Sequence, residues 1–319
     1  VTFSPQLFGS VIAGVQNEQA ELVKSFLIGL QTSLAVELRN ADPQVDCQED
    51  EWKRPEGGGG KTLAFKAGKV LEKGGINFSD VSGKQLPKTA TQNRPELEGS
   101  AFRGMGVSVV FHPDNPKIPT AHANVRYFEA RKENHALVWW FGGGFDLTPY
   151  YPYREDVLDW HLAAKSACDP FGVELYPKFK QWCDEYFYLP HRKETRGVGG
   201  IFFDDFDEGG FENSFSFMKK VGQTFQDSYF SIWEKRRELP FTEKEKEFQK
   251  YRRGRYAEFN LAYDRGTHFG LQSRGRTESI LMSMPPEVTW TYGWTPEKNS
   301  PEDDLYQNYL HPVNWLDIQ

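Results

Sequence analysis

Apolar and polar residues are spaced so that they predict an N-terminal helix, then several strands, then mostly helices. Between residues 15 and 40 apolar side chains recur about every four residues, as in an amphipathic helix, at Leu22, Phe26, Leu30, Leu34 and Leu38. Alternating or continuous apolar stretches predict strands at 63–66, 69–78, 106–112, 121–129, 136–141, around 200–204 and at 278–284. Helical spacing returns at 154–168, 176–187, 212–236 and 242–262.

Glycines mark two of the predicted boundaries. The polar stretch 43–62 ends in four glycines at 57–60, which predict a loop that is mobile or turns tightly. The buried strand 136–141 meets three glycines at 142–144, so it is predicted to stop there.

The order of the predicted elements indicates an α+β fold. Connections between strands in the first half are too short for crossover helices, so the sheet is expected to be largely antiparallel. The later helices cluster in sequence, and the last begins with a capping-box pattern at Thr242 and Glu245. The chain has no linker composition and no internal repeat, which predicts a single domain over residues 1–319.

Composition and charge indicate a globular protein and restrict its ligands. Hydrophobic residues make up 38% and charged residues 26% of the 319 positions. The net charge of −7 argues against nucleic acid as a partner. An anionic ligand would need a local cluster of arginines in such an acidic protein.

Cysteine usage and hydropathy indicate a reducing compartment. The cysteines Cys47, Cys168 and Cys183 have neither paired nor zinc-site spacing, so we expect free thiols. No apolar run approaches the ~20 residues that span a membrane. The first residues resemble neither a signal peptide nor a transit peptide, which favours the cytoplasm; a mitochondrial location is the alternative if a presequence was removed.

The predicted strand around residues 120–128 carries the most distinctive polar side chains. His122, Asn124 and Arg126 share one face because side chains alternate along a strand. The simple alternative is a solvent-exposed face, but such faces usually carry Lys, Glu, Thr or Ser. This row instead combines an acid/base group, an amide and a guanidinium that can bind a carboxylate through two hydrogen bonds. If the preceding strand forms a hairpin with it, Ser108 and His112 lie beside this row.

Further candidates lie next to glycines. Asp146 follows the glycines 142–144, where it either points into a site or caps a turn before Thr148 and Pro149. Arg196 precedes a glycine-rich strand start, and Arg274, Gly275 and Arg276 form a second arginine-glycine segment. The alternative for both arginine segments is a surface turn with a salt bridge.

Cofactor motifs are absent from the sequence. His112, His161 and His191 lie far apart without the spacing of a metal site, so structural histidines are the simpler interpretation. The glycines 57–60 lack the frame of a phosphate-binding loop, and no dinucleotide-binding glycine motif follows a strand. We therefore expect no nucleotide cofactor and assign no metal ligand.

The segment 180–204, with His-Arg-Lys-Glu-Thr-Arg-Gly-Val-Gly-Gly at 191–200, resembles the oxygen-dependent coproporphyrinogen III oxidase family. The resemblance extends over essentially the whole chain, with further motifs at 106–108, 112–116, 119–126, 139–149, 252–256 and 263–267. The chain departs from the family pattern at two places. Thr62 and Leu63 replace Ser-Arg, and Arg274-Gly275-Arg276 replaces Gly-Gly-Arg.

The resemblance implies a homodimer whose large antiparallel sheet lies between layers of helices. It also implies that O₂ is a co-substrate and that neither an organic cofactor nor an essential metal is required. By position, His122 is implied as the catalytic proton donor and Asp146 as the central carboxylate of the pocket. The implied substrate contacts are Ser108, Asn124, Val125, Arg126, Arg274, Gly275 and Arg276. In some bacterial relatives the positions of His112, His161 and His191 are proposed metal ligands, which stays a minority interpretation here.

The expected reaction converts two propionates of coproporphyrinogen III to vinyl groups and gives protoporphyrinogen IX in haem biosynthesis. Asp146 is expected to accept hydrogen bonds from pyrrole N–H groups, Arg126 and Arg276 to hold propionates, and His122 to move protons. Arg126 thus counts among both the catalytic and the binding residues. The alternatives are an inactive porphyrin-binding protein and a metal-dependent oxygenase.

Overall fold

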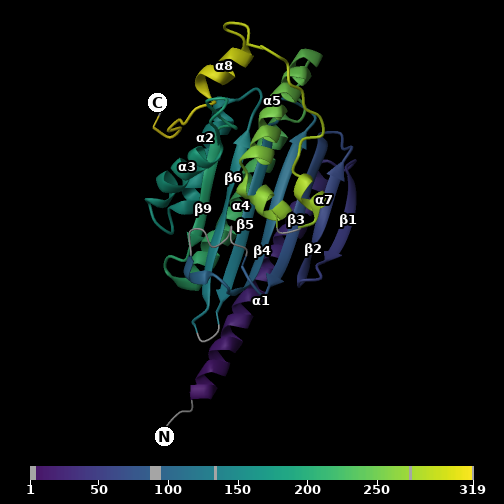
Figure 1. Cartoon of the computed structure of the whole chain (residues 1–319). Helices are drawn as coiled ribbons and strands as arrows, with labels where there is room; N and C mark the ends of the chain where they lie inside the picture. Colours follow the sequence, from purple (N-terminus) through teal and green to yellow (C-terminus); the bar gives the residue numbers. More distant parts are fainter. Residues whose placement is uncertain (1–4, 87–94, 133–134, 273–274, 318–319) are drawn as a thin grey trace.

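The computed structural model describes residues 5–86, 95–132, 135–272 and 275–317. Within these ranges, seven strands form one antiparallel sheet in the spatial order β1, β2, β3, β4, β5, β6, β9 (Figure 1). The strands are β1 (Asp46–Lys53), β2 (Gly58–Lys66), β3 (Leu71–Gly83), β4 (Ala101–Pro113), β5 (Thr120–Arg131), β6 (Val138–Thr148) and β9 (Gly199–Phe206). Consecutive strands pair as hairpins from β1 to β6, which confirms the predicted α+β fold and its antiparallel sheet.

Helices cover both faces of this sheet. Figure 1 shows α5 and α7 crossing one face, and α1 and α4 pack against the other. The described helices are α1 (Pro5–Ala41), α2 (Arg154–Cys168), α3 (Leu175–Tyr186), α4 (Gly210–Arg236), α5 (Glu243–Ala262), α6 (Arg265–Gln272), α7 (Thr277–Leu281) and α8 (Pro301–Asn308). A 3-10 turn at Pro95–Leu97 and a separate strand pair, β7 (Tyr188–Leu189) with β8 (Glu194–Thr195), complete the described elements.

The face toward α1 and α4 is the hydrophobic core. Alternate residues of β4, β5 and β6 point into it and are almost fully buried, namely Val107, Val109, Phe111, Ala121, Ala123, Val125, Tyr127, Phe141, Phe145 and Leu147. Burial of one large apolar side chain stabilises the fold by roughly 1.5–3 kcal/mol. This face therefore holds the strands in a fixed register, and the side chains between these positions project to the opposite face.

The face toward α5 and α7 is built from small and polar side chains. Two rows cross it in register, one of Thr62, Asn77, Ser108, Asn124 and Gly144, the other of Gly60, Ser79, Gly106, Arg126 and Gly142. We call these two rows the polar floor. Because most of its members are short, the floor lies close to the backbone of the sheet.

Two strand boundaries differ from the sequence-based prediction. The stretch predicted as a loop contains β1, whose polar residues suit an edge strand with one side open to solvent. The glycines 142–144 do not end a strand, because β6 continues through them to Thr148. At Gly144 a Cβ atom would lie 2.1 Å from the carbonyl oxygen of Ile201, so glycine there allows β6 and β9 to pair.

Prediction and structure also disagree near the C-terminal part. The segment 278–284 was predicted as a strand, but it contains α7, whose end packs Met282 onto β3. A Cβ at Gly75 would lie 2.0 Å from the Met282 sulfur, so this glycine makes room for the helix. A short apolar run does not by itself distinguish a strand from a buried helix.

The capping box predicted at the start of α5 is confirmed. Glu245 N–H donates to Thr242 Oγ1 at 3.3 Å, and Thr242 N–H donates to Glu245 Oε2 at 2.7 Å.

Candidate functional site

A histidine–carboxylate pair lies at one end of the polar floor. The register of β5 and β6 places His122 directly opposite Asp146, and His122 Nδ1–H donates to Asp146 Oδ1 at 2.9 Å. That hydrogen bond turns Nε2 of the imidazole away from the carboxylate. The His122 side chain is 25% exposed, whereas Asp146 is 2% exposed. His122 is therefore the member of the pair that can meet a ligand.

Arg196 completes this centre from the segment before β9. Its guanidinium donates to Asp146 Oδ2 at 2.7 Å and to Asn260 Oδ1 at 2.9 Å. The rings of Phe187 and Tyr256 lie 4.2 Å from the guanidinium carbon, so Arg196 is held in a fixed, buried position.

The pKa of Asp146 reflects this arrangement. Burial alone raises the pKa of the carboxyl group, but Arg196 and the hydrogen bond from His122 more than offset burial, and the pKa lies below its usual range. Asp146 is therefore ionised at neutral pH although it is buried. An ionised Asp146 accepts a hydrogen bond from His122 and so keeps a proton of the imidazole on Nδ1.

A second ionised carboxylate, Asp264, lies between α5 and α6. Its oxygens accept hydrogen bonds from the Tyr186 hydroxyl at 2.7 Å and from the hydroxyl and N–H of Thr267 at 2.7 and 2.9 Å. Burial raises the pKa of Asp264, the bonds from Thr267 and Tyr186 lower it, and the charge of His122 lowers it further, with a net pKa below the usual value. Asp264 was not among the predicted site residues, although it lies in the 263–267 motif that supported the family resemblance.

Arg126 lies further along the floor and is already engaged. It donates a hydrogen bond from one terminal nitrogen to Asn124 Oδ1 at 2.9 Å, and its other terminal nitrogen forms an ion pair with Asp204 Oδ1 at 2.9 Å. Its guanidinium carbon lies 5.7 Å from the centre of the Phe202 ring. About a third of the side chain is exposed, so Arg126 is accessible to an anionic ligand.

The predicted hairpin is confirmed, and it places the other residues of β4 and β5. Ser108 pairs with Asn124, which stands between His122 and Arg126 along β5. Val110 pairs with His122. Val125 differs from the others, because its side chain lies in the core on the opposite face. A role of Val125 in substrate binding would thus rest on its backbone.

Arg276 lies at the opposite edge of the sheet. It is the N-cap residue of α7 and forms an ion pair with Asp50 of β1. Four strand spacings separate β1 from β5, which corresponds to ~19 Å. Gly275 is needed beside it, since a Cβ there would lie 2.8 Å from the carbonyl oxygen of Gly270. Arg274 lies outside the described residues.

The three histidines considered as metal ligands have separate surroundings. His112 is bonded to Thr120 and to the Ser283 carbonyl oxygen. His161 is bonded to Tyr176 and the Val198 carbonyl oxygen. His191 pairs with Glu258 and Tyr263. Among the residues that the structure describes, no three His, Cys, Asp or Glu side chains are grouped as metal ligands.

Burial explains the state of two of these histidines. It lowers the pKa of His112 well below its usual value and the pKa of His161 to about 3. Both are therefore neutral at physiological pH, and their hydrogen bonds satisfy both ring nitrogens.

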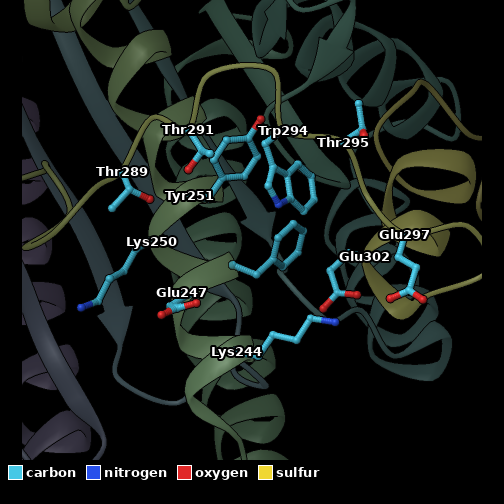
Figure 2. A pocket seen from close by; sticks show the side chains of 11 residues that line it. Lys244, Glu247, Lys250, Tyr251, Thr289, Thr291, Trp294, Thr295, Glu297 and Glu302 are labelled. Atoms are coloured by element: carbon cyan, nitrogen blue, oxygen red, sulfur yellow. The ribbon is translucent and has the colours of Figure 1, made fainter.

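A cavity of about 530 Å³ lies elsewhere, between α5 and the segment that follows α7. Figure 2 shows Trp294 beside Tyr251, with Lys244 extending toward Glu302. Its lining residues are Lys244, Glu247, Phe248, Lys250, Tyr251, Thr289, Thr291, Trp294, Thr295, Glu297 and Glu302. None of them belongs to the polar floor or to the His122 centre.

In the described part of the chain, no helix is both long enough and apolar enough to cross a membrane.

A family model described as coproporphyrinogen III oxidase matches residues 22–315, which is most of the chain. The match includes the polar floor, the His122 centre, Arg126 and Arg276. The resemblance recognised from the sequence motifs is thereby confirmed. The chain therefore belongs to the coproporphyrinogen III oxidase family, and it is an oxidoreductase of porphyrin biosynthesis that acts on coproporphyrinogen III.

Proposed function

We propose that the protein is an active, oxygen-dependent enzyme that converts two propionates of coproporphyrinogen III to vinyl groups. The observation that carries this proposal is the intact centre of His122, Asp146 and Arg196 at the end of a floor bordered by arginines. A protein that only carried porphyrins would need the arginines, but it would have no use for a partly exposed histidine oriented by a buried, ionised carboxylate.

The proposed chemistry balances with O₂ as the oxidant. For each propionate, the carbon next to the ring loses a hydrogen together with both electrons of its C–H bond. The bond to the carboxylate breaks, its electron pair forms the C=C double bond, and CO₂ leaves. O₂ takes up the hydrogen and the two electrons and, with one further proton, becomes hydrogen peroxide. The substrate itself is the reductant in this scheme, so we propose that no organic cofactor and no metal is required.

His122 supplies the proton in this proposal. Its Nδ1 is occupied by Asp146, so Nε2 is the atom that delivers and recovers protons. Both oxygens of Asp146 accept hydrogen bonds, from His122 and from Arg196. This engagement and its burial favour an orienting role for Asp146 over direct hydrogen bonding to pyrrole N–H groups.

The polar floor would receive the macrocycle. Its glycines and short polar residues let a flat ring approach the backbone. Arg126 on β5 and Arg276 beside β1 lie far apart along the floor, which matches a ligand with carboxylates around its rim. Ser108 and Asn124 would lie beneath the ring as hydrogen-bonding groups. Arg274 and Gly275 keep their assignment as substrate contacts beside Arg276.

We also propose a homodimer, a single domain and a cytoplasmic enzyme. Several large apolar side chains between residues 261 and 292 are exposed, which supports self-association; they are Leu261, Tyr263, Leu271, Trp290 and Tyr292. The family match runs over residues 22–315, which supports one domain. The cysteines are free thiols, as a reducing compartment would keep them.

The test is an assay of the purified protein with coproporphyrinogen III in air and under argon, with and without a chelator. We expect CO₂ release and a divinyl product by mass in air, equally with chelator, and neither under argon. Binding of the porphyrinogen without CO₂ release in air would instead identify a porphyrin carrier. Loss of activity with chelator, restored by a metal ion, would identify a metal-dependent oxygenase.

A further inference from the structure

Both arginines assigned to hold propionates are already paired with carboxylates of the protein. Arg126 Nη2 lies 2.9 Å from Asp204 Oδ1 on β9, and Arg276 forms an ion pair with Asp50 on β1. β1 and β9 are the two edge strands of the sheet. Each edge strand of the sheet thus contributes one aspartate that contacts an arginine of the site.

The Arg126–Asp204 pair depends on a glycine between its two strands. Arg126 on β5 reaches across β6 at Gly142 to meet Asp204. A Cβ at Gly142 would lie 2.6 Å from Asp204 Oδ1 and 2.7 Å from Arg126 Nη2. The backbone therefore leaves room for this contact, and the hydrogen bond of Arg126 to Asn124 holds the guanidinium in place.

The Arg276–Asp50 pair is positioned through the polar floor. Ser279 of α7 is hydrogen-bonded to Thr62 of β2 at 2.8 Å, which ties the helix to the sheet. Asp50 is the register partner of the same Thr62. Arg276 and Asp50 are therefore brought together by elements that are fixed independently of their charge.

Both pairs are partly exposed, so an incoming carboxylate can reach them. The side chains are 33% and 26% exposed for Arg126 and Asp204, and 37% and 32% for Arg276 and Asp50. The binding free energy that a ligand carboxylate gains is only the difference between its own contact with the arginine and the aspartate contact that it replaces. One carboxylate gains little from such an exchange, whereas a ligand with four of them engages both edges at once.

We propose that Asp204 and Asp50 are specificity-determining residues that compete with substrate carboxylates for Arg126 and Arg276. This inference rests on the proposed function for the chemistry of the ligand, a tetracarboxylate macrocycle. The competition weakens the hold on each propionate. The tetracarboxylate substrate is retained by several contacts, and the product, which has lost two carboxylates, is released as the aspartates take back their arginines.

The alternative role for these aspartates is purely positional, and it predicts the opposite sign. If Asp204 only holds Arg126 in place, its loss weakens ligand binding. If Asp204 competes, its loss tightens binding. Asp204→Asn keeps the size of the side chain and removes its charge, so it separates the two roles.

The test measures binding of coproporphyrin III, a stable tetracarboxylate, and of protoporphyrin IX, a dicarboxylate, to the whole protein by fluorescence titration. Asp204→Asn and Asp50→Asn should each bind coproporphyrin III about two- to fivefold more tightly than the wild type. Protoporphyrin IX should inhibit the turnover of these variants more strongly than it inhibits that of the wild type. The tetramethyl ester of coproporphyrin III, which has no free carboxylate, should bind all of these proteins equally.

Matched controls remove the same charge from the neighbouring residue. Asp205→Asn is the control for Asp204, and Glu51→Gln is the control for Asp50; both should leave coproporphyrin III affinity near the wild-type value. Unchanged or weaker binding in both Asp204→Asn and Asp50→Asn would overturn the competitor role. Equal tightening by the control variants would do so as well, because it would reflect general charge. If the wild type binds neither porphyrin, the proposed function itself fails, and the competitor role fails with it.

Discussion

The two faces of β5 carry opposite kinds of residues within one strand. Ala121, Ala123 and Val125 are buried against the helices of the core, whereas His122, Asn124 and Arg126 belong to the site. Because neighbouring residues share a backbone, the packing of one face sets the position of the other. The comparison teaches that the rigidity of the site comes from apolar residues that no ligand touches.

Substitution on the polar face should separate activity from stability most strongly. In His122→Gln the proton-transferring imidazole is lost, and turnover of coproporphyrinogen III should fall by about 10²–10⁴-fold. His122 is partly exposed but donates a hydrogen bond to the buried Asp146, so the free energy of unfolding should fall by no more than about 1–3 kcal/mol. Steady-state assays and urea unfolding of the same preparation measure both. A fall in activity that follows a fall in stability would contradict the division between the faces.

A substitution on the core face, one residue from the site, should do the reverse. Phe145 precedes Asp146 in β6 and is buried against Trp160 at a ring distance of 4.9 Å. Phe145→Ala should lower the free energy of unfolding by about 3–5 kcal/mol, through lost burial and the cavity that remains. Turnover per folded molecule, measured well below the melting temperature, should stay within about threefold of the wild type if the strand register is kept.

The buried histidines should make the fold sensitive to acid in a defined pH window. Burial lowers the folded-state pKa of His112 and His161, so the unfolded chain binds more protons once the pH falls below ~6.5. Stability should therefore decrease as the pH falls from ~6.5 toward the folded-state values, by about 1.4 kcal/mol per pH unit for each histidine.

Urea unfolding at about pH 7.0 and about pH 5.5 measures how the free energy of unfolding depends on pH. His161→Gln should reduce the slope by about one proton, while the exposed control His311→Gln should leave it unchanged. An unchanged slope in His161→Gln would show that this side chain is not kept neutral by the fold.

The smallest expected loss of turnover concerns Asn260, whose side chain is bonded to both Arg196 and Ser283. Its amide oxygen accepts from Arg196 at 2.9 Å, and its amide nitrogen donates to Ser283 Oγ at 3.3 Å. Asn260→Ala removes one hydrogen-bond partner of a buried guanidinium, which should cost about 1–3 kcal/mol of stability. Turnover should fall by only about two- to tenfold, since Asp146 still holds Arg196. If Arg196 acts through Asp146 and His122, the pH profile of turnover should also shift in Asn260→Ala. A profile identical to that of the wild type would contradict this connection.

Features set by local periodicity could be predicted, whereas features made by distant segments could not. The hairpin of β4 and β5 and the division of its residues between faces follow from a period of two, and both are confirmed. The edge strand β1 was missed because its polar residues show no apolar stripe. The helix α7 was mistaken for a strand because its apolar run is too short to show a period.

The composition of the site shows the same limit. His122 and Asp146 were singled out from the polar face and the glycines, but nothing in either segment indicates that Arg196 and Asn260 join them. That contact is made only when β9 and α5 pack beside β6. The arginine-glycine pattern around Arg196 was the one signal for it, and a surface turn explained that pattern equally well.

The pairing of His122 with Asp146 also bears on the order in which the site assembles during folding. The two residues lie on adjacent strands joined by a short connection, so their contact is local and forms at low entropic cost. Arg196 arrives only when β9 adds to the edge of β6. The centre is therefore complete only after β9 has added to β6, because a chain without this strand holds His122 and Asp146 together but lacks the guanidinium that offsets the burial of the carboxylate.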